Sequence, residues 1–237
     1  MSTLSIIATP IGNLEDITLR ALKVLAAADI ILCEDTRVTK KLLDRHSISK
    51  KTISYHAHSK LSRVDEVIVL LKEGKNLALV SDAGTPGISD PGSELVKKVR
   101  HELANEIRTG EIKIEAIPGP SALTSALSIA GVPCADFTFL GFLPHKKGRE
   151  TLFKEIVSSE RTVVFYESPH RIMKTLESLV EHLNGNSDHA APKKVTICRE
   201  LTKLFEEVVQ GTAKEVRDYF EEHQDKVKGE FVVLVSK

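Results

Sequence analysis

Tryptophan is absent from this chain of 237 residues, and cysteine is scarce. The cysteines, Cys33, Cys134 and Cys198, are odd in number and lie far apart in the sequence. This excludes a disulfide framework, and it also excludes the paired spacing of zinc and redox motifs. Scattered free cysteines are typical of a reducing compartment. We therefore expect a cytoplasmic protein that contains no metal ion.

The chain also lacks a net charge, because 33 Lys and Arg residues balance 33 Asp and Glu residues. Any basic surface that meets nucleic acid must therefore be local. No apolar run approaches the ~18 residues needed to span a bilayer, and the N-terminus does not have the basic and apolar regions of a signal peptide. With 41% hydrophobic residues, the composition predicts a globular protein that does not enter a membrane.

Several common motifs are missing as well. There is no GxxxxGK[ST] and no GxGxxG after the first predicted strand, which argues against a P-loop and against dinucleotide binding. The absence of HExxH and GxSxG argues against zinc proteases and α/β-hydrolases. His56 and His58 could face the same way in a strand, but no acidic or cysteine partner accompanies them. We interpret them as polar or substrate-facing residues rather than metal ligands.

What the first half does contain is a regular alternation of strand and helix patterns. Strands are predicted at residues 4–8, 30–33, 77–80 and 112–117, and helices at about 17–28, 36–44, 62–73 and 92–107. Asp16 is the predicted N-cap of the first helix. This order indicates a mostly parallel sheet that is covered by helices.

The pattern changes after Pro118-Gly119-Pro120. Strands are predicted at residues 137–140, 162–166, 195–199, 205–209 and 231–235. Two of these strands follow each other without a helix between them, which favours a mixed sheet. Residues 184–194 are small and polar and predict a surface connection. The chain is therefore predicted to contain two α/β domains, residues 1–117 and 118–237.

The most informative segment is SDAGTPGISDPG, residues 81–92, which follows the apolar strand at residues 77–80. Its glycines and prolines let the backbone pass close to a ligand, and Asp82, Thr85, Ser89 and Asp90 supply polar side chains. An elaborate surface loop is the alternative interpretation. We favour a binding loop, because loops on rigid α/β scaffolds so often carry the functional site.

Three further segments also follow predicted strands, namely residues 9–13, 34–37 and 118–121. Ligands bind outside the carboxyl ends of the strands of an open parallel sheet, so all four loops are expected along one edge. Residues 167–171 follow the strand at 162–166 and would form the opposite wall of a cleft between the domains.

Two acidic positions are candidates for catalysis. Asp35 lies next to Glu34 and two residues before Arg37, and this group is either a structural ion-pair turn or a catalytic carboxylate. Glu167 has the same two interpretations.

Two basic segments have equally open roles. The cluster Lys146-Lys147-Gly148-Arg149 is either the solvated start of a helix or a phosphate-binding site. Arg171 lies in the first turn of a predicted helix that Pro169 would begin.

Seven strings in this sequence closely resemble the 16S rRNA cytidine 2'-O-methyltransferases, the ribosomal RNA small subunit methyltransferase I family of the tetrapyrrole methylase superfamily. They are TPIGNLEDITLRAL (9–22), CEDTR (33–37), SDAGTPGISDPG (81–92), IPGPSAL (117–123), FLGFLPHKKGRE (139–150), FYESPHR (165–171) and RELTKLFEE (199–207). Their number and order extend the resemblance over nearly the whole chain.

The resemblance implies two α/β domains of the class III, tetrapyrrole methylase-like type, with S-adenosylmethionine in the cleft between them. It also implies a homodimer and a cytidine substrate in the decoding region of small-subunit rRNA. The residues that match the cofactor-binding loops of the family are Pro10, Ala83, Gly84, Thr85, Ile88, Ser121 and Ala122.

For the reaction, the resemblance leaves two candidates, Asp35 and Glu167, that would take or orient the ribose proton. The residues expected to contact RNA are Arg37, Lys146, Lys147, Arg149 and Arg171. The sequence departs from the family at residues 56–59, where His-Ala-His-Ser replaces the usual His-Glu-His-Asn. If that glutamate were an essential base, activity would be lost; we interpret it as a structural or substrate-side contact.

Two other functions remain open at this point. A porphyrinoid methyltransferase would share the fold and the cofactor loops, although the basic string at residues 139–150 argues against it. A ribosome-assembly protein that has kept the fold and lost catalysis would fit the altered segment at residues 56–59.

Overall fold

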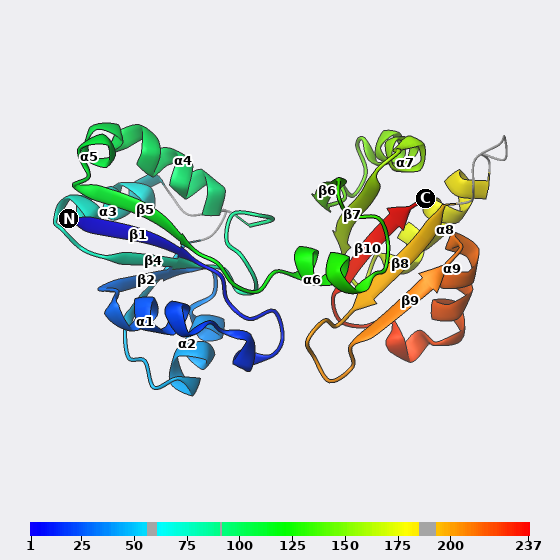
Figure 1. The fold of residues 1–237 in the computed structure, drawn as a ribbon, viewed down its shortest axis with the longest axis horizontal. Coiled ribbons are helices and arrows are strands. Elements are labelled where there is room, and N and C mark those ends of the chain that lie inside the picture. Colours follow the sequence, from blue (N-terminus) through cyan, green and yellow to red (C-terminus); the bar gives the residue numbers. More distant parts are fainter. Residues whose placement is uncertain (56–60, 91, 185–192) are drawn as a thin grey trace. The chain divides into compact units, whose positions relative to one another are not determined.

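A computed structural model describes residues 1–55, 61–90, 92–184 and 193–237 (Figure 1). The chain divides into two compact units, Met1–Ser121 and Ala122–Lys237, and each unit is built on its own five-stranded sheet. The predicted α/β fold with one parallel and one mixed sheet is confirmed. Within the described residues, no helix has the length and apolar character needed to cross a membrane.

The sheet of the first unit is parallel throughout and has the strand order β3-β2-β4-β1-β5. Its strands are β1 (Ser2–Ile7), β2 (Ile30–Cys33), β3 (Lys51–Ser54), β4 (Leu77–Val80) and β5 (Ile112–Ile117). Every residue of β2 and β4 is buried, as expected for central parallel strands that are covered on both faces. Because all five strands run the same way, their carboxyl ends meet at one edge, which we call the rim.

Helices cover both faces of this sheet (Figure 1). They are α1 (Leu19–Ala27), α2 (Thr36–Arg45), α3 (Leu61–Lys72), α4 (Gly92–Glu102) and α5 (Ala104–Thr109), with a 3-10 turn at Leu14–Asp16. One core contains Leu71 of α3 and Leu95 of α4, and the other contains Leu25 of α1 and Leu42 of α2. Packing on both faces holds the strands, and with them the rim loops, in a fixed frame.

Three details of the predicted first unit were wrong. Thr18 rather than Asp16 caps α1, because its side chain accepts a hydrogen bond from the Ala21 amide at 3.0 Å. The predicted helix at 92–107 is two helices, which are interrupted by the buried, non-helical Leu103. Strand β3 was missed because only one of its four residues, Ile53, is buried.

The second unit has a mixed sheet with the order β6-β7-β10-β8-β9. The strands are β6 (Phe137–Phe142), β7 (Thr162–Glu167), β8 (Lys194–Arg199), β9 (Glu207–Gly211) and β10 (Phe231–Ser236). Only the β6–β7 pair is parallel. The strand predicted at 205–209 begins two residues later, because residues 200–206 form a turn in which Glu200 and Thr202 have positive φ.

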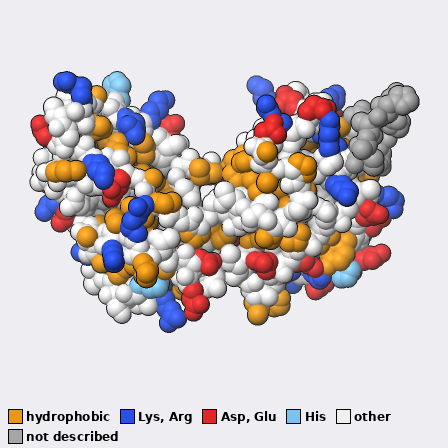
Figure 2. Space-filling model, in the orientation of Figure 1, with side chains coloured by type: hydrophobic (Ala, Val, Ile, Leu, Met, Phe, Trp, Pro, Cys, Tyr) orange, Lys and Arg blue, Asp and Glu red, His pale blue; other side chains and the backbone are white. Residues whose placement is uncertain are grey.

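The helices of this unit are α6 (Ala122–Ile129), α7 (Arg149–Ser158), α8 (Ile172–Asn184) and α9 (Ala213–Glu222), with a 3-10 turn at Gln224–Lys226. Phe153 of α7, Leu176 of α8 and Phe220 of α9 share a core with strand residues of the sheet. Most of the predicted surface connection at 184–194 lies outside the described residues. On the face that Figure 2 shows, acidic and basic side chains are interspersed on each unit, in keeping with the balanced charge.

Candidate functional site

The rim loops that follow β1, β4 and β5 are joined by hydrogen bonds. The amides of Thr9 and Gly84 each donate to the carbonyl of the other residue, at 2.9 and 3.0 Å. The hydroxyl of Thr85 donates to the Pro120 carbonyl at 3.1 Å. The loop that follows β2 is held as well, because the Asp35 amide donates to the Asp82 carboxylate at 2.9 Å. The predicted gathering of the four loops along one edge is confirmed.

Two glycines allow the loops to approach this closely. Gly84 has φ +80°, and a Cβ atom there would lie 3.3 Å from Cγ2 of Ile11. At Gly119 a Cβ atom would lie 3.1 Å from the Cβ of Ala8. A side chain at either position would push the loops apart. At these two positions the loops therefore meet backbone to backbone, with no side chain of the glycines between them.

Asp90 organises the end of the 81–92 loop. Its Oδ1 atom accepts hydrogen bonds from the amides of Gly87 at 2.6 Å and Gly92 at 3.1 Å. Gly92 begins α4, so the loop is tied to the helix that follows it. Ala83 and Ile88 are left exposed, with 49% of the Ile88 surface accessible. The side chains of Ala83 and Ile88 are thus open to a ligand.

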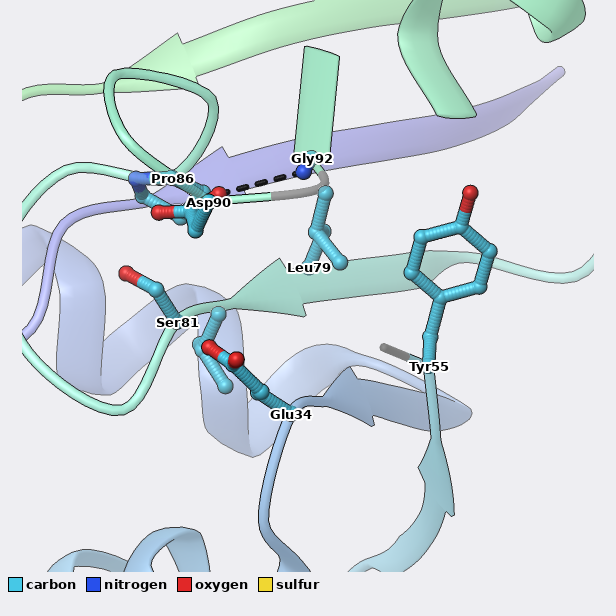
Figure 3. Close-up of a pocket in the computed structure, with 8 residues that line it drawn as sticks. Glu34, Tyr55, Leu79, Ser81, Pro86, Asp90 and Gly92 are labelled. Carbon is cyan, nitrogen blue, oxygen red and sulfur yellow. Dashed lines mark hydrogen bonds between the residues drawn. The ribbon is translucent and has the colours of Figure 1, made fainter. Parts of the chain in front are cut away.

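A small pocket opens beside this loop in the first unit (Figure 3). Its lining combines apolar and polar residues: Glu34, Tyr55, Leu79, Val80, Ser81, Pro86, Asp90 and Gly92. Glu34 and Ser81 come from the ends of β2 and β4, and Tyr55 follows β3. Burial, together with the charge of Glu94, raises the pKa of the Tyr55 hydroxyl. The pocket thus lies between the ends of β2 and β4 and the 81–92 loop, next to the predicted binding loop.

Asp35 is both the N-cap of α2 and the partner of an arginine. Its carboxylate accepts a hydrogen bond from the Arg37 amide at 2.8 Å, and Nη2 of Arg37 lies 2.6 Å from its Oδ2. These side-chain and backbone bonds from Arg37 lower the pKa of Asp35 to about 2. The Arg37 side chain is itself 87% exposed. The sequence left this group as either an ion-pair turn or a catalytic carboxylate, and the ion-pair turn is present.

Glu167 lies at the end of β7 in the second unit, and its side chain is fully buried. Oε2 accepts a hydrogen bond from the Thr175 hydroxyl at 2.7 Å, and Oε1 accepts one from the Ser168 amide at 2.9 Å. Nε of Arg171 lies 3.3 Å from Oε1. The carboxylate is thus surrounded by donors from its own unit.

The four basic residues predicted in this unit fall into two kinds. Arg171 donates to the Leu143 carbonyl at 2.7 Å, and Arg149 donates to the Thr175 hydroxyl at 2.8 Å. Lys146 and Lys147, by contrast, are exposed. The helix predicted near this cluster begins at Arg149, after Gly148 with φ +81°. The structure therefore separates two arginines that bind within the protein from two lysines that face solvent.

The remaining predicted residues lie at three places. Pro10 is buried in the loop that follows β1, Ser121 is the last residue of the first unit, and Ala122 begins α6. The segment that holds His56 and His58 lies outside the described residues. In the parts of the chain that are described, no three His, Cys, Asp or Glu side chains gather as a metal site requires.

Sequence reasoning missed the roles of two residues, Thr9 and Thr175. Thr9 begins the string at residues 9–22 and Gly84 lies in the string at residues 81–92, and both loops were expected at one edge of the sheet, so their contact could have been suspected. Thr175 lies eight residues beyond Glu167 in an ordinary helical pattern, and no local signal marks it.

Comparison with known proteins gives a consistent result. Residues 3–217 match the sequence profile of the family described as tetrapyrrole (corrin/porphyrin) methylases. The chain is 44% identical over 236 residues to a protein of Thermotoga maritima named ribosomal RNA small subunit methyltransferase I, and the match covers 100% of this chain and 99% of the relative. A protein of the same name from Escherichia coli O157:H7 is 42% identical over 234 residues, which cover 98% of this chain and 77% of the relative.

Solved structures agree on the fold. The methyltransferase CobJ superposes with a TM-score of 0.67 at 19% identity, over 100% of this chain and 95% of that chain. Diphthine synthase gives the same TM-score, 0.67, at 14% identity, over 100% of this chain and 90% of that chain. At these identities the likeness extends to the fold alone.

Proposed function

We propose that this chain, which belongs to the tetrapyrrole methylase family and within it to the ribosomal RNA small subunit methyltransferase I group, methylates the 2'-hydroxyl of a cytidine ribose in small-subunit (16S) rRNA. The methyl donor is S-adenosylmethionine. The observation that carries the proposal is the match to that group over the whole chain, at 44% identity. The rim supports it, because hydrogen bonds join its four loops and two glycines let their backbones approach closely.

The rim residues fit this cofactor. The close backbone approach at Gly84 and Gly119 is of the kind that lets loop backbone come near a ligand, and we propose that these loops hold the amino-acid and nucleoside parts of the molecule. The residues assigned to this role are Pro10, Ala83, Gly84, Thr85, Ile88, Ser121 and Ala122. When bound, S-adenosylmethionine supplies a methyl group on a sulfonium, so the departing group needs no proton.

The weak partner in the reaction is the ribose hydroxyl, which is almost fully protonated at neutral pH. Alignment of two reacting groups can lower a barrier by about 7 to 11 kcal/mol. A general base adds about 10²- to 10⁴-fold and works best when its pKa is near the working pH. With a pKa of about 2, Asp35 is a weak proton acceptor, but it stays ionised at neutral pH and can accept a hydrogen bond. We assign it the role of orienting the hydroxyl, with Arg37 as the contact for a neighbouring phosphate.

Asp35→Asn tests this assignment, because the amide keeps one oxygen acceptor while it loses the charge that holds Arg37. We expect kcat to fall by about 10- to 100-fold with unchanged cofactor affinity. The wild-type rate should show no titration that depends on Asp35 above about pH 4, because its pKa is about 2. A wild-type acid limb that disappears in the Asn variant would instead make Asp35 the base.

RNA contact is assigned to the exposed lysines of the second unit. Lys146 and Lys147 lie in the loop between β6 and α7 and face solvent. Exposed ammonium groups bind phosphates and release counterions, so they give affinity without reading sequence. The substrate is therefore proposed to be rRNA or an assembled small ribosomal subunit.

We also propose that the protein acts in the cytoplasm as a homodimer. Free, scattered cysteines fit a reducing compartment. The homodimer follows from the family resemblance, and light scattering of the purified protein at micromolar concentration tests it.

The first experiment is incubation of the purified protein with labelled S-adenosylmethionine and undermethylated small ribosomal subunits. Label in an alkali-resistant dinucleotide is the expected result, because 2'-O-methylation blocks alkaline cleavage of the next phosphodiester bond. Label in alkali-sensitive RNA would show methylation at another atom. Cofactor binding without transfer to subunits or naked rRNA would favour a porphyrinoid substrate or a non-catalytic assembly role.

A further inference from the structure

A buried carboxylate lies beneath the exposed basic loop of the second unit. Glu167 is fully buried, yet it belongs to no helix cap and to no surface ion pair. A buried charge is tolerated only when hydrogen bonds and an opposite charge compensate it. Here the Ser168 amide, the Thr175 hydroxyl and the Arg171 guanidinium supply that compensation. Such an arrangement makes the position of each partner depend on the carboxylate.

The partners of Glu167 reach directly to the segment that carries the lysines. Nη2 of Arg171 donates to the carbonyls of Leu143 at 2.7 Å and Pro144 at 3.3 Å. These two carbonyls come immediately before His145, Lys146 and Lys147. The start of the loop is therefore bonded to the Arg171 guanidinium, which is itself paired with the Glu167 carboxylate.

A second arginine reaches the same segment through a hydroxyl. Nη2 of Arg149 donates to Oγ1 of Thr175 at 2.8 Å, and the same hydroxyl donates to Glu167. Nη1 of Arg149 lies 3.4 Å from the Pro144 carbonyl, and its guanidinium stacks over the Phe153 ring at 4.9 Å. Burial and the nearby charge of Arg171 lower the pKa of Arg149. Both Nη atoms of Arg149 thus bond to groups within the protein.

We infer that Glu167 is a positioning residue, which acts through Arg171, Thr175 and Arg149 to hold residues 143–148 in the shape that presents Lys146 and Lys147 to RNA. This inference rests on the proposed function. In this proposal the two lysines contact phosphate. The glutamate and the two arginines do not contact the substrate but fix the position of the lysines. Pre-ordering a binding loop raises affinity because less conformational freedom is lost on binding.

The test is a double-mutant cycle between the network and the loop. Glu167→Gln is measured alone and in a Lys146→Gln/Lys147→Gln background, with KM for undermethylated subunits, kcat at saturating RNA and the dissociation constant of S-adenosylmethionine as readouts. We expect Glu167→Gln alone to raise KM about fivefold with kcat and cofactor affinity unchanged. In the background without the lysines, the same substitution should change KM less than twofold, because it acts only through them.

Thr175→Val provides a second variant in case Glu167→Gln fails to fold. It keeps the side-chain shape and removes the hydroxyl that joins Arg149 to Glu167, and it should show the same coupling to the lysines. Asp136→Asn is the control, because it breaks an exposed 2.7 Å ion pair with Arg161 in the same unit and should leave all three readouts unchanged.

Each other outcome overturns one part of the argument. If Glu167→Gln lowers kcat, the residue acts in the chemical step. If its effect on KM persists without the lysines, it contacts the substrate itself. If neither network variant changes KM while the lysine variant does, the network only stabilises the unit. If the lysine variant leaves KM unchanged, the assignment of the loop to RNA fails, which is a failure of the proposed function rather than of the network.

Discussion

Removal of Lys146 and Lys147 should change the salt dependence of RNA binding by an amount that the structure sets. The sequence predicts four basic residues of the second unit as RNA contacts, but Arg149 and Arg171 are bound to carbonyls and a hydroxyl within the protein. Of these four, Lys146 and Lys147 are therefore the ones counted as able to meet phosphates. Each phosphate contact on single-stranded RNA contributes about 0.7 to the slope of log K against log salt.

The variant Lys146→Gln/Lys147→Gln should accordingly reduce that slope by about 1.4. Between 50 and 200 mM KCl, the wild-type protein should lose about sevenfold more affinity than the variant. Fluorescence anisotropy with a labelled fragment of the decoding region measures both slopes. Lys51→Gln/Lys75→Gln is the matched control. It removes the same charge from exposed positions of the first unit, at the start of β3 and just before β4, on the edge of the sheet opposite the rim.

An unchanged slope in the loop variant would refute the assignment of these lysines. Arg149→Gln and Arg171→Gln give a second check. If each arginine variant lowered the slope by about 0.7 with the lysine loop intact, the arginines would be phosphate contacts and the count of two would be wrong.

Three further predictions concern stability and reactivity. Burial disfavours protonation of His182, but hydrogen bonds to the Ser178 carbonyl and the Glu150 carboxylate raise its pKa overall; the pair should therefore stabilise the fold below about pH 6.5 and lose this effect as the pH rises through the folded pKa. Glu150→Gln should thus lower the stability by about 0.2 to 1 kcal/mol at pH 6 and by less at pH 9 in thermal unfolding. Gly131 has φ +62° and open space around it, so Gly131→Ala should lower the free energy of unfolding by about 1 kcal/mol. Gly229→Ala should lower it further in denaturant unfolding, because the new Cβ would lie 2.3 Å from Glu200. Equal losses of stability in the two variants would show that the Glu200 side chain moves away freely. Cys134 is exposed, whereas burial raises the pKa of Cys33 and raises that of Cys198 to about 12, so a thiol reagent should label one cysteine in the native protein and all three in denaturant.

Much of the fold was readable from the sequence because central parallel strands are short apolar runs. Residues 30–33 and 77–80 are buried at every position, and their short apolar runs are enough to identify them as strands. Strand β3 could not be placed in this way, because its pairing with β2 rather than its own composition makes it a strand. The break at Leu103 was equally invisible, since a leucine in a helical pattern gives no sign of leaving the helix.

The acidic candidates show the same division. Asp35 and Arg37 are two residues apart at the start of a helix, so their ion pair follows from local geometry and could be listed from the sequence as one of two alternatives. The surroundings of Glu167 could not, because its partners include a hydroxyl eight residues away and an arginine that reaches to residues 143 and 144. The sequence by itself determined the family, the order of the elements and which residue types carry the chemistry. The tertiary structure alone decided which charges are buried and paired and which are free to meet a substrate, because burial depends on residues that are distant along the chain.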